Sequence, residues 1–210
     1  MDDLASHTLT LGPHPGARER WNRGRPAYAV WLARLDFVDL RRRYFAAQAV
    51  LDAWIRTLPA PDTHLTVWVA GFPCASPRFD DDVAESTLEA QAQIIARSPP
   101  LRLDVGGLRA FRSAAYLTVR DLDGGLARLR ADLGQLGREQ RWGPYVPHVT
   151  VGHFTADWPA GPILAAMAPL SELPPLPLRV TALERVDLDA LREGAPLRPT
   201  LTLKLSGESR

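Results

Sequence analysis

The chain has 210 residues, of which 46% are hydrophobic and 23% are charged, and its formal net charge is +1. This length allows one sizeable core or two tightly joined lobes. A charge near zero argues against electrostatic capture of long nucleic acid. The sequence has no apolar run of membrane-spanning length and no signal-like N-terminus, so we expect a cytoplasmic protein with no membrane partner. Cys74 is the single cysteine, which excludes an intramolecular disulfide and a cysteine-rich zinc site.

The first 26 residues differ in character from the rest of the chain. They are rich in glycine and proline and show little apolar periodicity, which is typical of a loop-like segment. We therefore expect residues 1–26 to form a flexible N-terminal extension and residues 27–210 to form one folded domain.

From residue 27 onward, strand and helix patterns alternate. Residues 28–37 are typical of a buried strand, and residues 40–58 place apolar side chains at helical spacing. Two prolines end this helix, and residues 64–71 then alternate as in a strand. Asp82 and Glu85 are spaced as a capping box, which predicts that a second helix begins there and continues to about residue 97.

The second half of the chain loosely repeats this order. It begins with two strands joined near Gly106 and Gly107, continues with an amphipathic helix, and ends with three further strands. The repetition predicts an α/β or α+β fold with a largely antiparallel sheet. The predicted elements cover residues 101–105, 114–120, 123–139, 148–154, 178–188 and 200–205.

The strongest signal is a tetrapeptide that occurs once in each half. HLTV begins at His64 and HVTV begins at His148, 84 residues later. Side chains alternate between the two faces of a strand, so each histidine shares a face with the threonine two positions on, Thr66 or Thr150. With this composition, two such copies are expected by chance in roughly one sequence in 500.

The residues of this pair suit the opening of a cyclic phosphodiester. That reaction needs a base to take a proton from water and an acid to protonate the departing sugar oxygen. Histidine can serve as either near neutral pH, and the hydroxyl groups of Thr66 and Thr150 can donate to the phosphate oxygens. Neither tetrapeptide offers a further metal ligand, so we expect no metal and no other cofactor. The alternative interpretation is two histidines satisfied within the core.

The two motifs resemble those of the two-histidine (2H) phosphoesterase superfamily, and most closely its branch of bacterial 2′-5′ RNA ligases and RNA 2′,3′-cyclic phosphodiesterases. The resemblance covers about residues 28–205 and includes Pro147 before the second motif. It implies a bilobal α+β fold, with two pseudo-symmetric antiparallel sheets, outer helices and a central active-site groove. It also implies that His64 is the general acid, that His148 is the general base, and that the product is a 2′-phosphate.

Three further side chains are candidates for the surroundings of the site. Alternation places Trp68 on the face of His64, where its ring could stack on a nucleobase or pack at a strand edge. Tyr145 precedes the second motif and is a second candidate for base stacking. His153 occupies a position where many relatives have a phosphate-binding arginine, but strict alternation turns it to the opposite side unless a bulge intervenes.

ATP-dependent ligation is disfavoured, because Lys204 stands in only a partial match to a nucleotidyl-transfer motif. We therefore expect hydrolysis of RNA-terminal or nucleoside 2′,3′-cyclic phosphates, with any 2′-5′ ligation arising as the reverse of phosphodiester transfer. The same histidines could instead act on 2′-5′ oligonucleotides or cyclic dinucleotides. A protein of another class, a non-catalytic RNA- or nucleotide-binding module, is also open. The expected partners are RNA ends or small nucleotides, and the expected state is a monomer.

Overall fold

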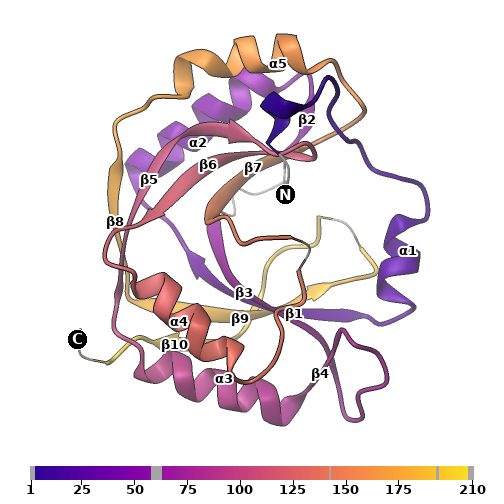
Figure 1. The fold of residues 1–210 in the computed structure, drawn as a ribbon, viewed down its shortest axis with the longest axis vertical. Coiled ribbons are helices and arrows are strands. Elements are labelled where there is room, and N and C mark those ends of the chain that lie inside the picture. The colour runs from indigo at the N-terminus through magenta and orange to yellow at the C-terminus, as the bar shows by residue number, and fades with distance from the viewer. Residues whose placement is uncertain (1–2, 58–62, 142, 193, 208–210) are drawn as a thin grey trace.

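The computed structural model describes residues 3–57, 63–141, 143–192 and 194–207. Ten strands form two five-stranded sheets within these residues (Figure 1). In spatial order, the first sheet consists of β10 (Pro199–Lys204), β9 (Ala182–Asp189), β1 (Ala27–Arg34), β3 (His64–Cys74) and β4 (Asp82–Ala84). The second sheet consists of β2 (Ile55–Arg56), β7 (His148–Phe154), β6 (Ala114–Asp121), β5 (Leu101–Ala110) and β8 (Leu176–Val180).

Neighbouring strands are antiparallel in both sheets, except that β3 and β4 run parallel. The chain repeats one unit of strand, helix, motif strand and helix. The helices of the two units are α2 (Val38–Leu51), α3 (Glu85–Arg97), α4 (Gly125–Gly134) and α5 (Ala160–Met167). The structure therefore has the bilobal α+β architecture with outer helices that the motifs imply.

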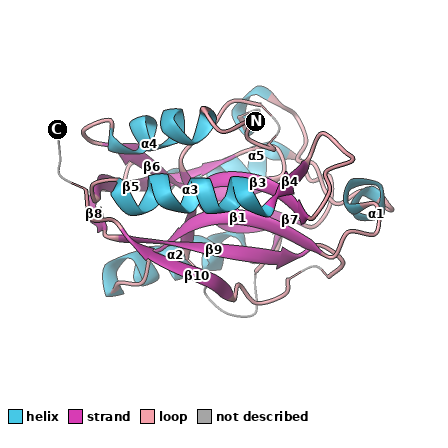
Figure 2. Ribbon diagram, turned by 90° about the horizontal axis from the view of Figure 1, so that it is seen from below, coloured by secondary structure: helices cyan, strands magenta, loops and turns pink. Residues whose placement is uncertain are grey.

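The first helix of each repeat contacts the lobe of the other repeat. Helix α2 follows β1 of the first sheet, yet it packs against α5 and β7 of the second lobe. Helix α4 follows β6 of the second sheet and lies between the lobes, because it contacts β5 and β6 of its own sheet as well as α3 and β3 of the first lobe. Figure 1 shows α2 and α5 together at one end of the molecule and α3 and α4 at the other, and in Figure 2 α3 crosses the strands of the first sheet. The two lobes are thereby joined through shared helices.

One apolar core extends through both lobes. The apolar residues of the two tetrapeptides, Leu65, Val67, Val149 and Val151, are all fully or almost fully buried in it. Burial of these four side chains fixes the facing of both motif strands, because the histidine and threonine between them must point to the other side.

The N-terminal residues are packed on the domain instead of extending from it. They include a short 3-10 helix, η1 (Leu4–Ser6), and helix α1 (Ala17–Asn22). Leu4 is completely buried, and the backbone nitrogen of Leu11 donates to the carbonyl of Arg112 at 2.7 Å. The expected flexible extension is therefore corrected: glycine and proline here shape a segment that follows the surface closely.

Two of the predicted helices are shorter than expected. Helix α2 ends at Leu51, after which Ile55 and Arg56 pair with β7; residue 58 lies outside the described residues. Helix α4 ends at Gly134 because the residues after it form a loop that returns to β3. A second 3-10 helix, η2 (Ala168–Leu170), follows α5.

Two local predictions are wrong for identifiable reasons. The Asp82 carboxylate accepts from the backbone nitrogens of Arg78 and Phe79 and also binds Arg25, so it does not cap α3. Gly106 and Gly107 lie inside β5, not in the turn after it. A Cβ at Gly107 would lie 2.0 Å from the carbonyl oxygen of Ser171, so glycine there serves a close approach of two backbones. No helix in the described part of the chain is long and apolar enough to cross a membrane.

Candidate active site

The two motif strands meet in the middle of the molecule. His64 is the first residue of β3 and His148 is the first residue of β7, and these two strands contact each other. Within its sheet, Thr66 lies opposite Leu32 of β1, and Thr150 lies opposite Tyr116 of β6. Both histidines and both threonines are half-buried, and each threonine lies between fully buried apolar neighbours.

Each motif strand has a β-bulge at the same place. In β3, Val67 has no partner between the pairs formed by Thr66 and Trp68, and in β7, Val151 is skipped in the same way. The bulged residue is therefore the fourth residue of each tetrapeptide. A bulge places two successive side chains on one side of the sheet, so alternation is inverted for the residues that follow.

This inversion overturns the expectation for Trp68. The ring is only 4% exposed and belongs to the core, so it has almost no surface on which a base could stack. At the matching position of β7 lies Gly152, which is also buried. A Cβ there would come within 2.7 Å of the Ile55 side chain, because β2 occupies the space.

The same inversion returns His153 to the side of His148 and Thr150. It is exposed between the buried residues Gly152 and Phe154, and its charge acts on the imidazole of His148. The strict alternation that turned His153 away is therefore corrected by the bulge at Val151.

His148 is held on several sides. Its Nδ1 lies 2.6 Å from the carbonyl oxygen of Val146. The rings of Phe111 and Tyr116 meet it edge to face, with centroids 5.0 and 5.4 Å away, and stack on each other at 4.0 Å. These contacts fix the plane of the imidazole.

The surroundings of His148 favour its neutral form. Burial lowers the pKa of the imidazole below its usual value, and only the Val146 carbonyl acts in the opposite direction. The positive charges of Arg141 and His64 lower the pKa further. The effect of His64 also indicates that the two motif histidines are close enough to interact electrostatically.

The loop between α4 and β7 is bound to the first motif strand. The hydroxyl group of Tyr145 donates to the carbonyl oxygen of Thr66 at 2.8 Å. Arg130 lies 3.4 Å over the Tyr145 ring and forms an ion pair with Glu139 at 2.5 Å, and Glu139 in turn accepts from the backbone nitrogen of Val69. Tyr145 therefore joins the two motifs, and its cation–π contact replaces the expected stacking on a base.

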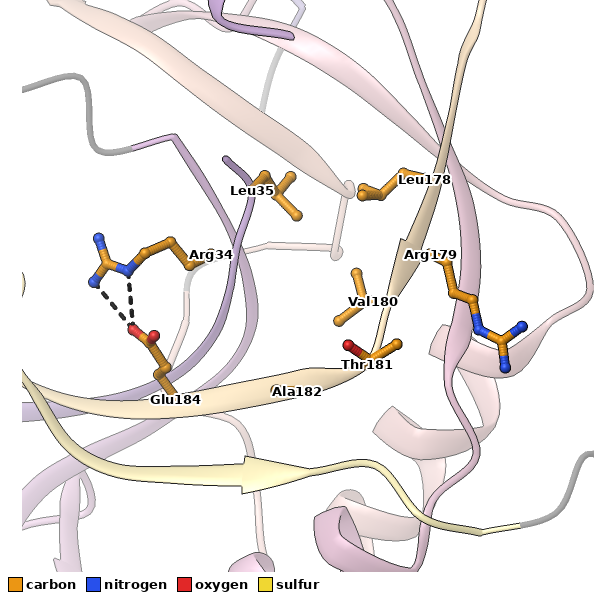
Figure 3. A pocket seen from close by; sticks show the side chains of 8 residues that line it. All are labelled: Arg34, Leu35, Leu178, Arg179, Val180, Thr181, Ala182 and Glu184. Atoms are coloured by element: carbon orange, nitrogen blue, oxygen red, sulfur yellow. Dashed lines mark hydrogen bonds and ion pairs between the residues drawn. The ribbon is translucent and has the colours of Figure 1, made fainter. Parts of the chain in front are cut away.

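Arg34 of β1 lies opposite His64 of β3, but its guanidinium already forms an ion pair within the protein. Its guanidinium binds Glu184 at 3.0 Å and donates to the carbonyl of Leu197. Figure 3 shows this ion pair beside a cavity of about 160 Å³, with Arg34 directed toward Glu184. Arg34 consequently contributes to the edge of the site rather than to phosphate binding.

Sequence reasoning missed the side chains that surround the pair. Phe111, Tyr116, Arg130, Glu139 and Arg141 carry no motif, and their roles depend on strand register and on the path of one loop. The alternation of β6 was the one available signal, because it gives Tyr116 a defined face. No group of three or more metal-ligating side chains gathers among the residues with described positions.

A family model, the 2′-5′ RNA ligase superfamily, matches residues 29–191. None of the curated proteins compared with the chain matches it. Several solved structures share its fold. TT0787 of Thermus thermophilus is 19% identical, with a TM-score of 0.58 over 87% of this chain and 100% of that one.

LigT of E. coli gives a similar result. Its apo form is 19% identical, with a TM-score of 0.59 over 87% of this chain and 99% of that one, and the complex of LigT with 3′-AMP aligns equally well. The family match covers both His-x-Thr strands and most of the chain. The protein therefore belongs to the 2′-5′ RNA ligase superfamily of two-histidine phosphoesterases.

Proposed function

We propose that this protein hydrolyses 2′,3′-cyclic phosphodiesters, at RNA ends or on nucleosides, to 2′-phosphates by metal-independent acid–base catalysis. His148 is the general base, His64 is the general acid, and Thr66 and Thr150 bind the phosphate. The observation that carries the proposal is the state of His148, which lies within electrostatic reach of His64, with its pKa lowered and its Nδ1 already bound.

The hydrogen bond of His148 selects the nitrogen that reacts. A carbonyl oxygen only accepts, so Nδ1 must carry the hydrogen in its bond to Val146. In the neutral ring, Nε2 then has the free lone pair that a base requires. Burial lowers the pKa and keeps the ring in this form at neutral pH.

The reaction balances with these groups alone. Nε2 of His148 takes a proton from water, and the water oxygen forms a bond to phosphorus. The bond between phosphorus and the 3′-oxygen breaks, and His64 gives its proton to that oxygen. The hydroxyl groups of Thr66 and Thr150 donate to the non-bridging oxygens as negative charge accumulates on them. The product is a 2′-phosphate with a free 3′-hydroxyl group.

The first experiment replaces each histidine. With a nucleoside 2′,3′-cyclic phosphate as substrate, His64→Ala and His148→Ala are expected to lower kcat about 10²–10⁴-fold, which is the range for loss of a positioned acid or base. His14→Ala is the matched control, because His14 is exposed on the N-terminal segment. A non-catalytic binding module would instead show no turnover in the unsubstituted protein and a change in affinity only.

Assays in EDTA test the metal-free mechanism. Full activity is expected after removal of divalent ions, because the two imidazoles supply both proton transfers. Loss of activity that zinc or manganese restores would contradict the proposal. The same assay with 2′-5′ oligonucleotides and cyclic dinucleotides at equal concentration ranks the other substrates by kcat/KM.

A further inference from the structure

A second polar pocket lies beside the candidate active site. It has a volume of about 200 Å³, and it combines two arginines with two aromatic rings. Its lining residues are Trp21, Tyr28, Asp81, Arg138, Gln140, Arg141 and Gly143. Trp21 comes from α1, so the N-terminal segment supplies part of the wall.

The pocket lies on the face of the first sheet that carries His64 and Thr66. In β1, the side chains on that face alternate from Arg34, opposite His64, to Leu32, opposite Thr66, and on to Tyr28. At the other end of this row, Tyr28 lines the pocket and donates to the carbonyl of Gln140 at 2.6 Å. Tyr28 therefore lies on the same strand face as the motif, with the buried residues Val30 and Leu32 between them.

Arg141 connects the pocket to the second motif. It lines the pocket, lies 4.9 Å from the Tyr145 ring, and acts through its charge on His148. Its Nη1 is buried and has no hydrogen-bond partner among the described residues. A buried guanidinium nitrogen without an acceptor is costly, which indicates that an anion completes the site when ligand is bound.

The pocket keeps a net positive charge. Its acidic member, Asp81, is bound by both terminal nitrogens of Arg25, at 2.6 and 2.9 Å. Nearby, Glu139 is bound by Arg130. Arg138 and Arg141 form no ion pair within the part of the chain that the structure describes, so their charges are available to a ligand.

We propose that this pocket is a second phosphate subsite, in which Arg138 and Arg141 bind the phosphate on the 5′ side of the terminal nucleotide. This inference rests on the proposed function, because it places the cyclic phosphate at His64 and His148. The half-buried Trp21 forms an aromatic wall beside that phosphate. The preferred substrate is then an oligonucleotide end, and a nucleoside cyclic phosphate fills only half of the site.

Binding of product analogues to the full chain tests the subsite without any turnover. Calorimetric titration compares adenosine 2′-phosphate, adenosine 2′,5′-bisphosphate and a diadenylate with a terminal 2′-phosphate. The last two are expected to bind about tenfold more tightly than the first. Arg141→Gln and Arg138→Gln should each remove most of this preference, while Arg42→Gln, an exposed arginine of α2, should keep it.

A diadenylate with a neutral methylphosphonate linkage should bind no better than adenosine 2′-phosphate. Equal affinity for all four ligands in the unsubstituted protein would overturn the subsite, as would a preference that survives both arginine substitutions. Neither result depends on hydrolysis. An active enzyme without the preference would refute the subsite alone, and a preference without hydrolysis would refute the proposed function alone.

Discussion

At the scale of single residues, His148 shows how packing selects a chemical role. Aromatic rings and a backbone carbonyl surround its imidazole, and burial lowers its pKa while a second histidine lies within electrostatic reach. In the proposed mechanism His64 takes the opposite role, because a neutral His148 requires one proton donor in the pair. The proposed base is thus distinguished by the surroundings of His148, although the two tetrapeptides are nearly the same.

The pH dependence of catalysis follows from that pKa. The base form of His148 is lost only below its lowered pKa, so the acid limb of kcat/KM should lie below the ordinary value for histidine, about 6.5. Rates measured from pH 4 to 9 check this. An acid limb of kcat/KM centred above pH 7 would contradict the assignment of His148 as the general base.

The same shift has a consequence for folding. Below about pH 6.5 the unfolded chain binds a proton at His148 before the folded protein does. This contribution to stability is therefore complete above that pH, and it is lost as the pH falls toward the lowered pKa of the folded state.

At the scale of elements, the paired bulges decide which side chains face the site. Val67 and Val151 occupy the same position of the two motifs, and each inverts the alternation of the residues after it. One bulge moves Trp68 into the core, and the other moves His153 toward His148. The bulge is thus a structural part of the motif that cannot be recognised from the tetrapeptide sequence alone.

Gly152 tests the packing that follows the second bulge. A Cβ there would lie 2.7 Å from Cδ1 of Ile55 and 3.0 Å from the carbonyl of Arg56, so Gly152→Ala should lower the free energy of unfolding by about 1–3 kcal/mol. Urea denaturation measures this. Gly161→Ala in α5 is the control, because nothing lies within 4 Å of its Cβ position. Equal stability of the two variants would show that β2 can move away from the added methyl group without a cost in the free energy of unfolding.

The sequence predicted the motif strands well and most other strands to within a few residues. The strand predicted over residues 178–188 is wrong, because it is two strands, β8 and β9, in different sheets. Prediction from the sequence succeeded where the spacing of apolar residues reflects burial, as in β7, whose bounds agree fully although a bulge interrupts its alternation. It failed where tertiary contacts override local pattern. Asp82 has the spacing of a cap but binds Arg25 instead, and the double glycine in β5 allows a close approach to Ser171. The arginines near the site were missed because their positions depend on one loop.

At the scale of the whole molecule, the N-terminal segment contacts both lobes. Its beginning pairs with Phe111 near the second sheet, through a bridge from Asp3. Its end packs on the first sheet, where Trp21 meets Tyr28 and Phe72 with centroids 4.7 and 5.1 Å away. This segment follows the edge of both lobes (Figure 1) and contributes to the stability of the domain as a unit.

Leu4→Ala tests that contribution. The side chain is fully buried, so its loss should cost about 2–5 kcal/mol in the free energy of unfolding. Leu9→Ala is the control, because that side chain is 41% exposed. Thermal or chemical denaturation compares the two variants. If Leu4→Ala were as stable as the unsubstituted protein, the N-terminal segment would not contribute to the stability of the domain.

The packing of α2 on the second lobe also describes what the first repeat would lack on its own. Helix α2 would then lack β7 and α5, on which its buried face packs. A lone repeat could bury this face only by associating with a second copy. Within one chain, α2 thus takes the place that an exchanged element has in a domain-swapped dimer.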